Sequence, residues 1–214
     1  MNPLSMETLL NQTHIHPREI AKKLYNPKDV GVLVLPYALP KSTRGQLILE
    51  YVDHPFIYSE NNEEEHFDDC STFVPKLKHK PVEPLSLEQS LPITYQLHQE
   101  LQQLYSEITR HAKLSSGNLN SIIIQNFKKG SKGLSNRTEP SDTSNMAIAG
   151  VLSGQAFFYA NSPTCFSIYK APVGSLILVR AQIPANQELL PTYALGRVDE
   201  ERTLLWMREK TQEN

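Results

Sequence analysis

Two arginines near the C-terminus have a spacing that suits ligand binding. Arg202 and Arg208 lie six residues apart in the run RTLLWMR. An even spacing places both side chains on one face of a strand. A guanidinium group presents five N–H donors and pairs well with a carboxylate. The pair predicts a carboxylate site, and the alternative is two arginines at the ends of a surface strand.

Other charged clusters have simpler explanations. Lys128, Lys129, Lys132 and Arg137 form a basic cluster that could contact phosphate or could be a solvated loop. The acidic run 59–69 is most simply a solvated loop.

Several classes of enzyme find no support in the residues. There is no G-x-S-x-G nucleophile elbow and no glycine-rich phosphate loop. Cys70 and Cys165 lie 95 residues apart and form neither a CxxC pair nor a zinc set. His14 and His16 have the spacing of a metal pair, but no third ligand is evident.

Composition indicates a compact chain with a buried core, since 39% of the residues are hydrophobic. A formal net charge of -2 gives no general case for a non-specific polyanion binder. Fifteen prolines argue against a long helical bundle. We find neither a signal peptide nor a membrane-length apolar run, and we expect an intracellular protein, cytoplasmic or nuclear, with reduced thiols.

The elements that must position these residues change character along the chain. Residues 1–28 predict an arm or an added helical layer, 30–34 a buried strand, and 45–52 a helix. Apolar residues at helical intervals predict a long helix over 91–108, within a helical support of about 86–112. About six short β-rich runs follow over residues 118–208, separated by turn residues: 118–127, 146–152, 155–160, 165–169, 175–180 and 202–208. We therefore predict an α+β chain, mainly β, with a barrel or jelly-roll core in a single domain over 29–210.

The order of the motifs in the second half resembles that of a known family. The sequence contains, in order, QNFKKG at 125–130, NRTE at 136–139, IAGVLSG at 148–154, GSLILV at 174–179, PTYAL at 191–195 and RTLLWMR at 202–208. This series resembles the AlkB-type 2-oxoglutarate/Fe(II) dioxygenases, which show N-x-Y-x-x-G, H-x-D, I-x-x-x-S-L-G, G-S-L-L-x-M, a distal histidine and R-x5-R. The resemblance covers residues 30–208 and implies a double-stranded β-helix with N-terminal helices packed on one sheet.

The same resemblance implies a changed metal site. Arg137 stands where the family has its first histidine, Glu139 replaces the aspartate, and Tyr193 replaces the distal histidine. None of the seven histidines follows residue 111. Arginine has no free lone pair for a metal, so we expect an Arg-Glu-Tyr cluster in place of Fe(II), and no metal cofactor.

The oxoglutarate site is half kept in this alignment. Arg202 and Arg208 match the arginines that hold the oxoglutarate carboxylates in the family, whereas Gln125 and Phe127 replace its asparagine and tyrosine. We expect 2-oxoglutarate or another dicarboxylate to bind only weakly, because the metal that normally supplies part of the affinity is missing.

The resulting hypothesis is a catalytically inactive AlkB-like domain that acts as a binding or regulatory subunit. We expect a protein partner, with nucleic acid held by Lys128, Lys129 and Lys132 as another option and no role for a membrane. One alternative is an active oxygenase, a demethylase or hydroxylase of nucleic acid or protein, with atypical ligands such as Glu139 or Asp142 and a histidine from the N-terminal half. A second alternative is an unrelated interaction protein.

Overall fold

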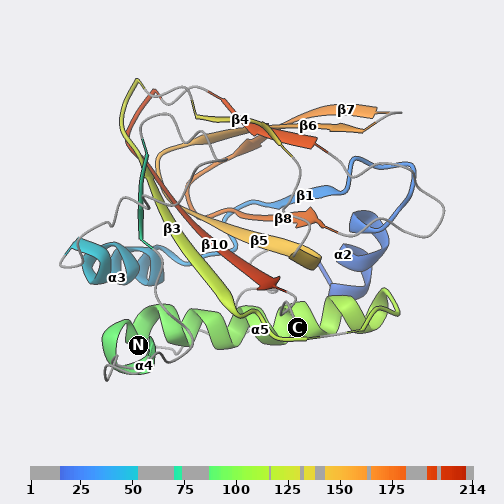
Figure 1. Ribbon diagram of the computed structural model, residues 1–214, viewed down its shortest axis with the longest axis horizontal. Coiled ribbons are helices and arrows are strands. Elements are labelled where there is room, and N and C mark those ends of the chain that lie inside the picture. The colour runs from blue at the N-terminus through green and yellow to red at the C-terminus, as the bar shows by residue number, and fades with distance from the viewer. Residues whose placement is uncertain are drawn as a thin grey trace.

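The chain folds into two antiparallel β-sheets with a layer of helices against one of them (Figure 1). In a computed structural model of the protein, the described residues are 15–52, 70–73, 87–115, 117–130, 133–137, 143–162, 165–181, 192–196 and 199–210. The acidic run 59–69 and the residues Lys132, Glu139 and Asp142 lie outside these ranges.

Helices form the layer under the larger sheet (Figure 1). They are α2 (Pro17–Leu24), α3 (Lys41–Val52), α4 (Leu87–Ser90) and α5 (Pro92–His111). The helices predicted over 45–52 and 91–108 are confirmed, each somewhat longer than its periodic core. Within the predicted arm, α2 buries Ile20 and Leu24 in the core, so this part is a helical layer. No helix in the described ranges is long and apolar enough to cross a membrane.

The strands confirm the predicted mainly-β fold class. The larger sheet has the order β1 (Val32–Leu35), β8 (Leu176–Arg180), β5 (Thr143–Ser153), β10 (Arg202–Lys210), β3 (Ser121–Phe127) and β2 (Cys70–Phe73). The smaller sheet has the order β4 (Leu134–Arg137), β9 (Thr192–Leu195), β6 (Ala156–Ser162) and β7 (Cys165–Ala171). The two sheets face each other as in a jelly roll (Figure 1).

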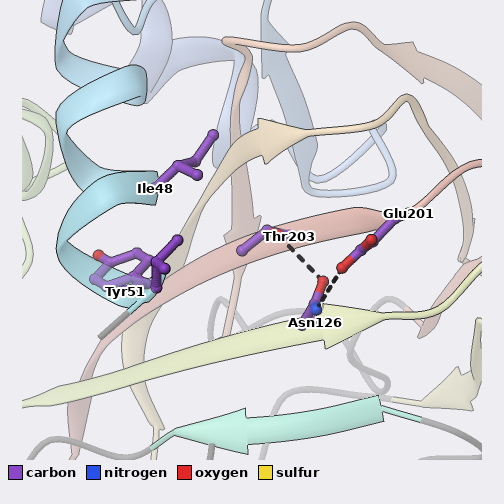
Figure 2. Close-up of a pocket in the computed structure, with 6 residues that line it drawn as sticks. Ile48, Tyr51, Asn126, Glu201 and Thr203 are labelled. Atoms are coloured by element: carbon purple, nitrogen blue, oxygen red, sulfur yellow. Dashed lines mark hydrogen bonds between the residues drawn. The ribbon is translucent and has the colours of Figure 1, made fainter. Parts of the chain in front are cut away.

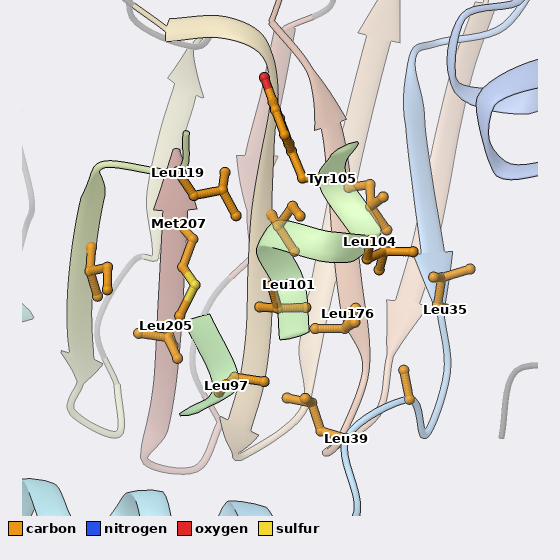
Figure 3. Packing of buried hydrophobic residues seen from close by; sticks show 14 of the residues in the cluster. Leu35, Leu39, Leu97, Leu101, Leu104, Tyr105, Leu119, Leu176, Leu205 and Met207 are labelled. Carbon is orange, nitrogen blue, oxygen red and sulfur yellow. The ribbon is translucent and has the colours of Figure 1, made fainter. Parts of the chain in front are cut away.

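Strand β10 has both faces buried, because it lies between the helices and the smaller sheet. Leu205 and Met207 pack with α5 in the core under the helices (Figure 3). Leu204 and Trp206 alternate with them and belong to the core between the sheets. This two-residue alternation fixes which side chains of β10 face the interior of the jelly roll.

Three short strands were not among those counted from the sequence. Residues 134–137 lie in the stretch read as a loop, yet they form β4, which pairs with β9 over 192–195. Residues 70–73 form β2 at the edge beside β3. These four-residue segments lack a periodic apolar pattern, and their pairing depends on partners about 55 residues away in sequence, which no local window contains.

Candidate functional site

The four side chains predicted to hold oxoglutarate lie on one face of two adjacent strands. In the β3–β10 pair, Phe127 is opposite Arg202 and Gln125 is opposite Leu204. This face points toward the smaller sheet, because Phe127 and Leu204 belong to the core between the sheets. Gln125 is 3%, Arg202 1% and Arg208 6% exposed. The alternative of surface arginines at strand ends is therefore wrong for both.

Arg202 ties the larger sheet to the smaller one. Its Nε donates to the carbonyl oxygen of Gln155 at 3.0 Å and its Nη1 to that of Gly196 at 3.4 Å. Among the described residues, no carboxylate lies within the 4.0 Å ion-pair limit of its guanidinium. Burial lowers the pKa of Arg202, and the carboxylates of Asp199 and Glu200 partly offset this effect. An arginine stays charged nonetheless, so the interior holds a cation of which only two N–H groups have acceptors among the described residues.

Arg208 lies at the other end of the same row. Its guanidinium carbon is 5.2 Å from the centroid of the Trp206 ring, a cation–π arrangement. Six residues of strand separate the Cα atoms of Arg202 and Arg208 by about 20 Å. One small dicarboxylate therefore reaches both guanidinium groups only if the side chains lean toward each other. Arg208 leans toward Trp206, which lies nearer to Arg202 along β10.

Two buried polar atoms in this row have no hydrogen-bond partner among the described residues. They are Oε1 of Gln125 and Nε1 of Trp206, whose residues are 3% and 1% exposed. Leaving such an atom unpaired costs about 1–3 kcal/mol. One is an acceptor and the other a donor, and both lie on the face that carries Arg202 and Arg208. The residues predicted to bind oxoglutarate thus lie beside polar atoms that make no hydrogen bond within the described part of the chain.

The positions aligned with the family's histidines also come together. Arg137 of β4 and Tyr193 of β9 are register partners in the smaller sheet. Tyr193 is 1% exposed, and its ring stacks on Phe158 with centroids 5.0 Å apart and an interplanar angle of 14°. Trp206 lies 6.0 Å from the Tyr193 ring on the opposing sheet. The side chain of Arg137, and Glu139 entirely, lie outside the described part, so the Arg-Glu-Tyr cluster stays a prediction.

Comparison with solved structures identifies this architecture. No protein-family model and no curated protein sequence matches the chain. A prolyl-4-hydroxylase from Pseudomonas putida is similar, with a TM-score of 0.63, 11% identity, and coverage of 90% of this chain and 99% of that one. The chain has the fold of the 2OG-Fe(II) oxygenases. An oxidoreductase of the 2OG-Fe(II) oxygenase family from Burkholderia pseudomallei matches with a TM-score of 0.62, 13% identity, and coverage of 91% and 89%.

A third similar structure has the same fold. The prolyl hydroxylase of Trichoplax adhaerens, in complex with a peptide fragment from hypoxia inducible factor, has a TM-score of 0.61, 11% identity, and coverage of 91% and 90%. These likenesses concern the 2OG oxygenase fold as a whole. They do not distinguish the AlkB subgroup from other oxygenases of this fold, so membership of that subgroup stays a prediction from the motif order.

The AlkB resemblance predicts arginine, glutamate and tyrosine at the metal-ligand positions, a donor set that would not suit a ferrous ion. The guanidinium of Arg137 cannot donate a lone pair, and the Tyr193 ring is packed in an aromatic stack. Within the described ranges, no group of three or more His, Cys, Asp or Glu side chains is placed to hold a metal ion. The replacement of the usual two-histidine, one-carboxylate ligand set stays a prediction of the resemblance.

The predicted basic groove has a mixed electrostatic character in the described part. Lys128 and Lys129 are exposed just beyond the end of β3. The acidic stretch 199–201 lies at the start of the neighbouring strand β10. Cations and anions are interspersed at this end of the sheet, which agrees with a solvated surface.

One contributor to the interior row was read from the sequence only as core. Trp206 is buried as expected, but its indole N–H also belongs to this row and has no acceptor in the part of the chain that the structure describes. The available signal was its even spacing from both arginines, which places all three on one face of β10.

Proposed function

We propose that this 2OG oxygenase fold binds an anionic ligand between its sheets without oxidising it, and acts as a binding or regulatory subunit. The observation that carries the proposal is the packing of Tyr193. By the AlkB resemblance this residue occupies the position of the distal histidine, and its ring is stacked on Phe158 in the aromatic core. A tyrosine whose ring packs in the core does not replace the distal histidine as a metal ligand. Arg137 cannot replace the first histidine, because a guanidinium has no lone pair to donate.

The ligand class follows from the donors on the inner face. Of the five N–H groups of Arg202, two donate to backbone carbonyls, which leaves three without an acceptor in the described ranges. The unpaired indole N–H of Trp206 is a fourth donor on the same face. Donors with one fixed positive charge select a carboxylate. We therefore propose 2-oxoglutarate or a related dicarboxylate, held weakly because no metal chelates its keto acid end.

A protein partner is supported by the edge of the smaller sheet. Phe166 and Ile168 on edge strand β7 are 61% and 58% exposed. Two large apolar side chains exposed on an edge strand are typical of protein–protein contact. Lys170 is the one cation exposed on this face of β7, and two apolar side chains beside a single cation favour a protein over a nucleic acid.

The test combines a metal assay with a ligand assay on the full chain. We expect no stoichiometric binding of Fe(II) or Mn(II) by calorimetry, and no succinate formation from 2-oxoglutarate in the presence of iron and ascorbate. We expect 2-oxoglutarate alone to raise the melting temperature. Stoichiometric iron with turnover of oxoglutarate would refute the proposal and favour the active oxygenase with atypical ligands.

A matched analogue series separates specific binding from a general salt effect. Glutarate keeps both carboxylates and should stabilise the protein to a similar degree, since the proposal has no metal that would coordinate the keto group. Butyrate, with one carboxylate, should stabilise it less. Equal shifts from dicarboxylate, monocarboxylate and chloride at matched ionic strength would remove the ligand site.

A further inference from the structure

A pocket lies on the face of β10 opposite the interior row. Its volume is about 280 Å³, and it opens between helix α3 and the paired ends of β3 and β10 (Figure 2). Thr203 lines this pocket, whereas Arg202, the preceding residue on the strand, faces the interior between the sheets. The lining residues are Ile48, Tyr51, Val52, Asn126, Glu201 and Thr203.

One wall of the pocket is a directed chain of hydrogen bonds that ends on a carboxylate. Ser153 Oγ donates to Thr203 Oγ1 at 3.1 Å, and Thr203 Oγ1 donates to Asn126 Oδ1 at 3.2 Å. Asn126 Nδ2 then donates to Glu201 Oε1 at 2.8 Å (Figure 2). The amide orientation follows from chemistry, because an ionised carboxylate only accepts.

This direction leaves the wall short of donors. The hydroxyl protons of Ser153 and Thr203 are both donated within this series of hydrogen bonds. Of the side chains in the series, only Asn126 keeps a further N–H to donate. Oε2 of Glu201 takes no part in this series of hydrogen bonds and can accept from a ligand. A ligand that brings N–H donors complements this wall, and a ligand that brings only acceptors does not.

The other wall is apolar and held in place. Tyr51 is 4% exposed and its hydroxyl lies 2.7 Å from Thr94 Oγ1 on α5, so the ring presents only its apolar surface to the pocket. Ile48 lies one turn earlier on α3, on the same side (Figure 2). Val52 is 72% exposed at the rim, where a ligand would cover it. This wall suits the apolar body of a ligand.

Charge selects the head group. Glu201 is the one ionisable carboxylate among the described lining residues, so the charge that faces the pocket is negative. The ion pairs found in the described part both involve Glu107 on α5, and no cation lies within the 4.0 Å limit of Glu201 there. We propose that this pocket binds a small organic cation, a primary or secondary ammonium group on an apolar body, with the ammonium on Glu201.

Three matched probes test the proposal on the full chain: 4-phenylbutylammonium, 4-phenylbutanol and 4-phenylbutyrate. They share the apolar body and differ in head-group charge. Titrations followed by amide NMR signals of Asn126, Glu201 and Thr203 should show the ammonium binding about ten-fold more tightly than the alcohol. The carboxylate should bind most weakly. Equal affinities for the three probes, or no shift of these signals up to millimolar ammonium, would overturn the proposal.

A pair of charge-neutralising variants locates the head group. Glu201→Gln should lower the affinity for the ammonium probe to that of the alcohol and leave the alcohol unchanged. Glu200→Gln is the control, because the Glu200 carboxylate accepts from Gln155 N at 2.9 Å and does not line the pocket. Both side chains are exposed, so neither variant endangers folding. An equal loss in the two variants would reduce the effect to general acidity and refute the site.

Discussion

Replacing Arg202 with methionine tests the interior site and the packing that holds it. Methionine keeps an unbranched stem of similar reach and removes the charge and the donors. The well-formed bond is Nε to Gln155 O at 3.0 Å, whereas the bond to Gly196 O at 3.4 Å is long and contributes little. A hydrogen bond from a charged donor is worth about 1.5–3 kcal/mol. We expect the variant to lose about 2 kcal/mol of unfolding free energy, or about 4–8 °C of melting temperature for a chain of this size.

Ligand binding then separates function from stability. At about 100 times its dissociation constant, 2-oxoglutarate should add about 2.7 kcal/mol to the wild type, a rise of about 5–11 °C. The Arg202→Met variant should show no rise at the same concentration. Circular dichroism melts with and without ligand, over a range of concentrations, measure both effects.

The control is an arginine outside the site. The Arg110 side chain is 68% exposed and pairs with Glu107 on the surface of α5, so Arg110→Met should change stability by less than about 0.5 kcal/mol and leave the ligand shift intact. An Arg202→Met protein as stable as the wild type would show that the hydrogen bonds of Arg202 to backbone carbonyls contribute no more than the desolvation of its charge costs. An unchanged ligand shift in that variant would remove Arg202 from the site.

Three further outcomes are expected. Burial raises the pKa of the Tyr51 phenol, so the folded state holds this proton more tightly than the unfolded state. Stability should therefore be unaffected by this group below about pH 10 and fall above it by up to about 1.4 kcal/mol per pH unit. Tyr51→Phe should reduce that alkaline slope in urea unfolding. The triple variant Arg137→His, Glu139→Asp, Tyr193→His should gain affinity for Mn(II) by calorimetry, and no gain would contradict the alignment of the three positions. Gly154 has a φ of +64°, and a Cβ there would lie 2.5 Å from the carbonyl oxygen of Glu201, so Gly154→Ala should cost about 1–3 kcal/mol in denaturant unfolding.

The two sites occupy opposite faces of one strand and make separate demands. Residues of even number on β10 carry the interior row, whereas Thr203 belongs to the outer pocket. Glu201→Gln should therefore leave the oxoglutarate shift unchanged, and Arg202→Met should leave ammonium binding unchanged. Loss of both ligands in either variant would indicate unfolding of this end of the sheet.

The sequence by itself determined the features that depend on residue type and local period. The apolar spacing over 91–108 specifies the long helix, and an even separation puts Arg202 and Arg208 on one face wherever a strand forms. The restriction of histidine to the first 111 residues excludes a histidine ligand from the later strands. The motif order was enough to predict a 2OG oxygenase fold.

Only the tertiary structure decided what these side chains contact. The carbonyl oxygen that holds Arg202 is 47 residues away in sequence, and β4 exists only because β9 pairs with it. The burial of Tyr193 requires rings from two sheets, and the outer pocket requires α3 to meet the ends of β3 and β10. Such contacts join distant segments, so no local pattern encodes them, and they appear only when chain topology closes the sheets on each other.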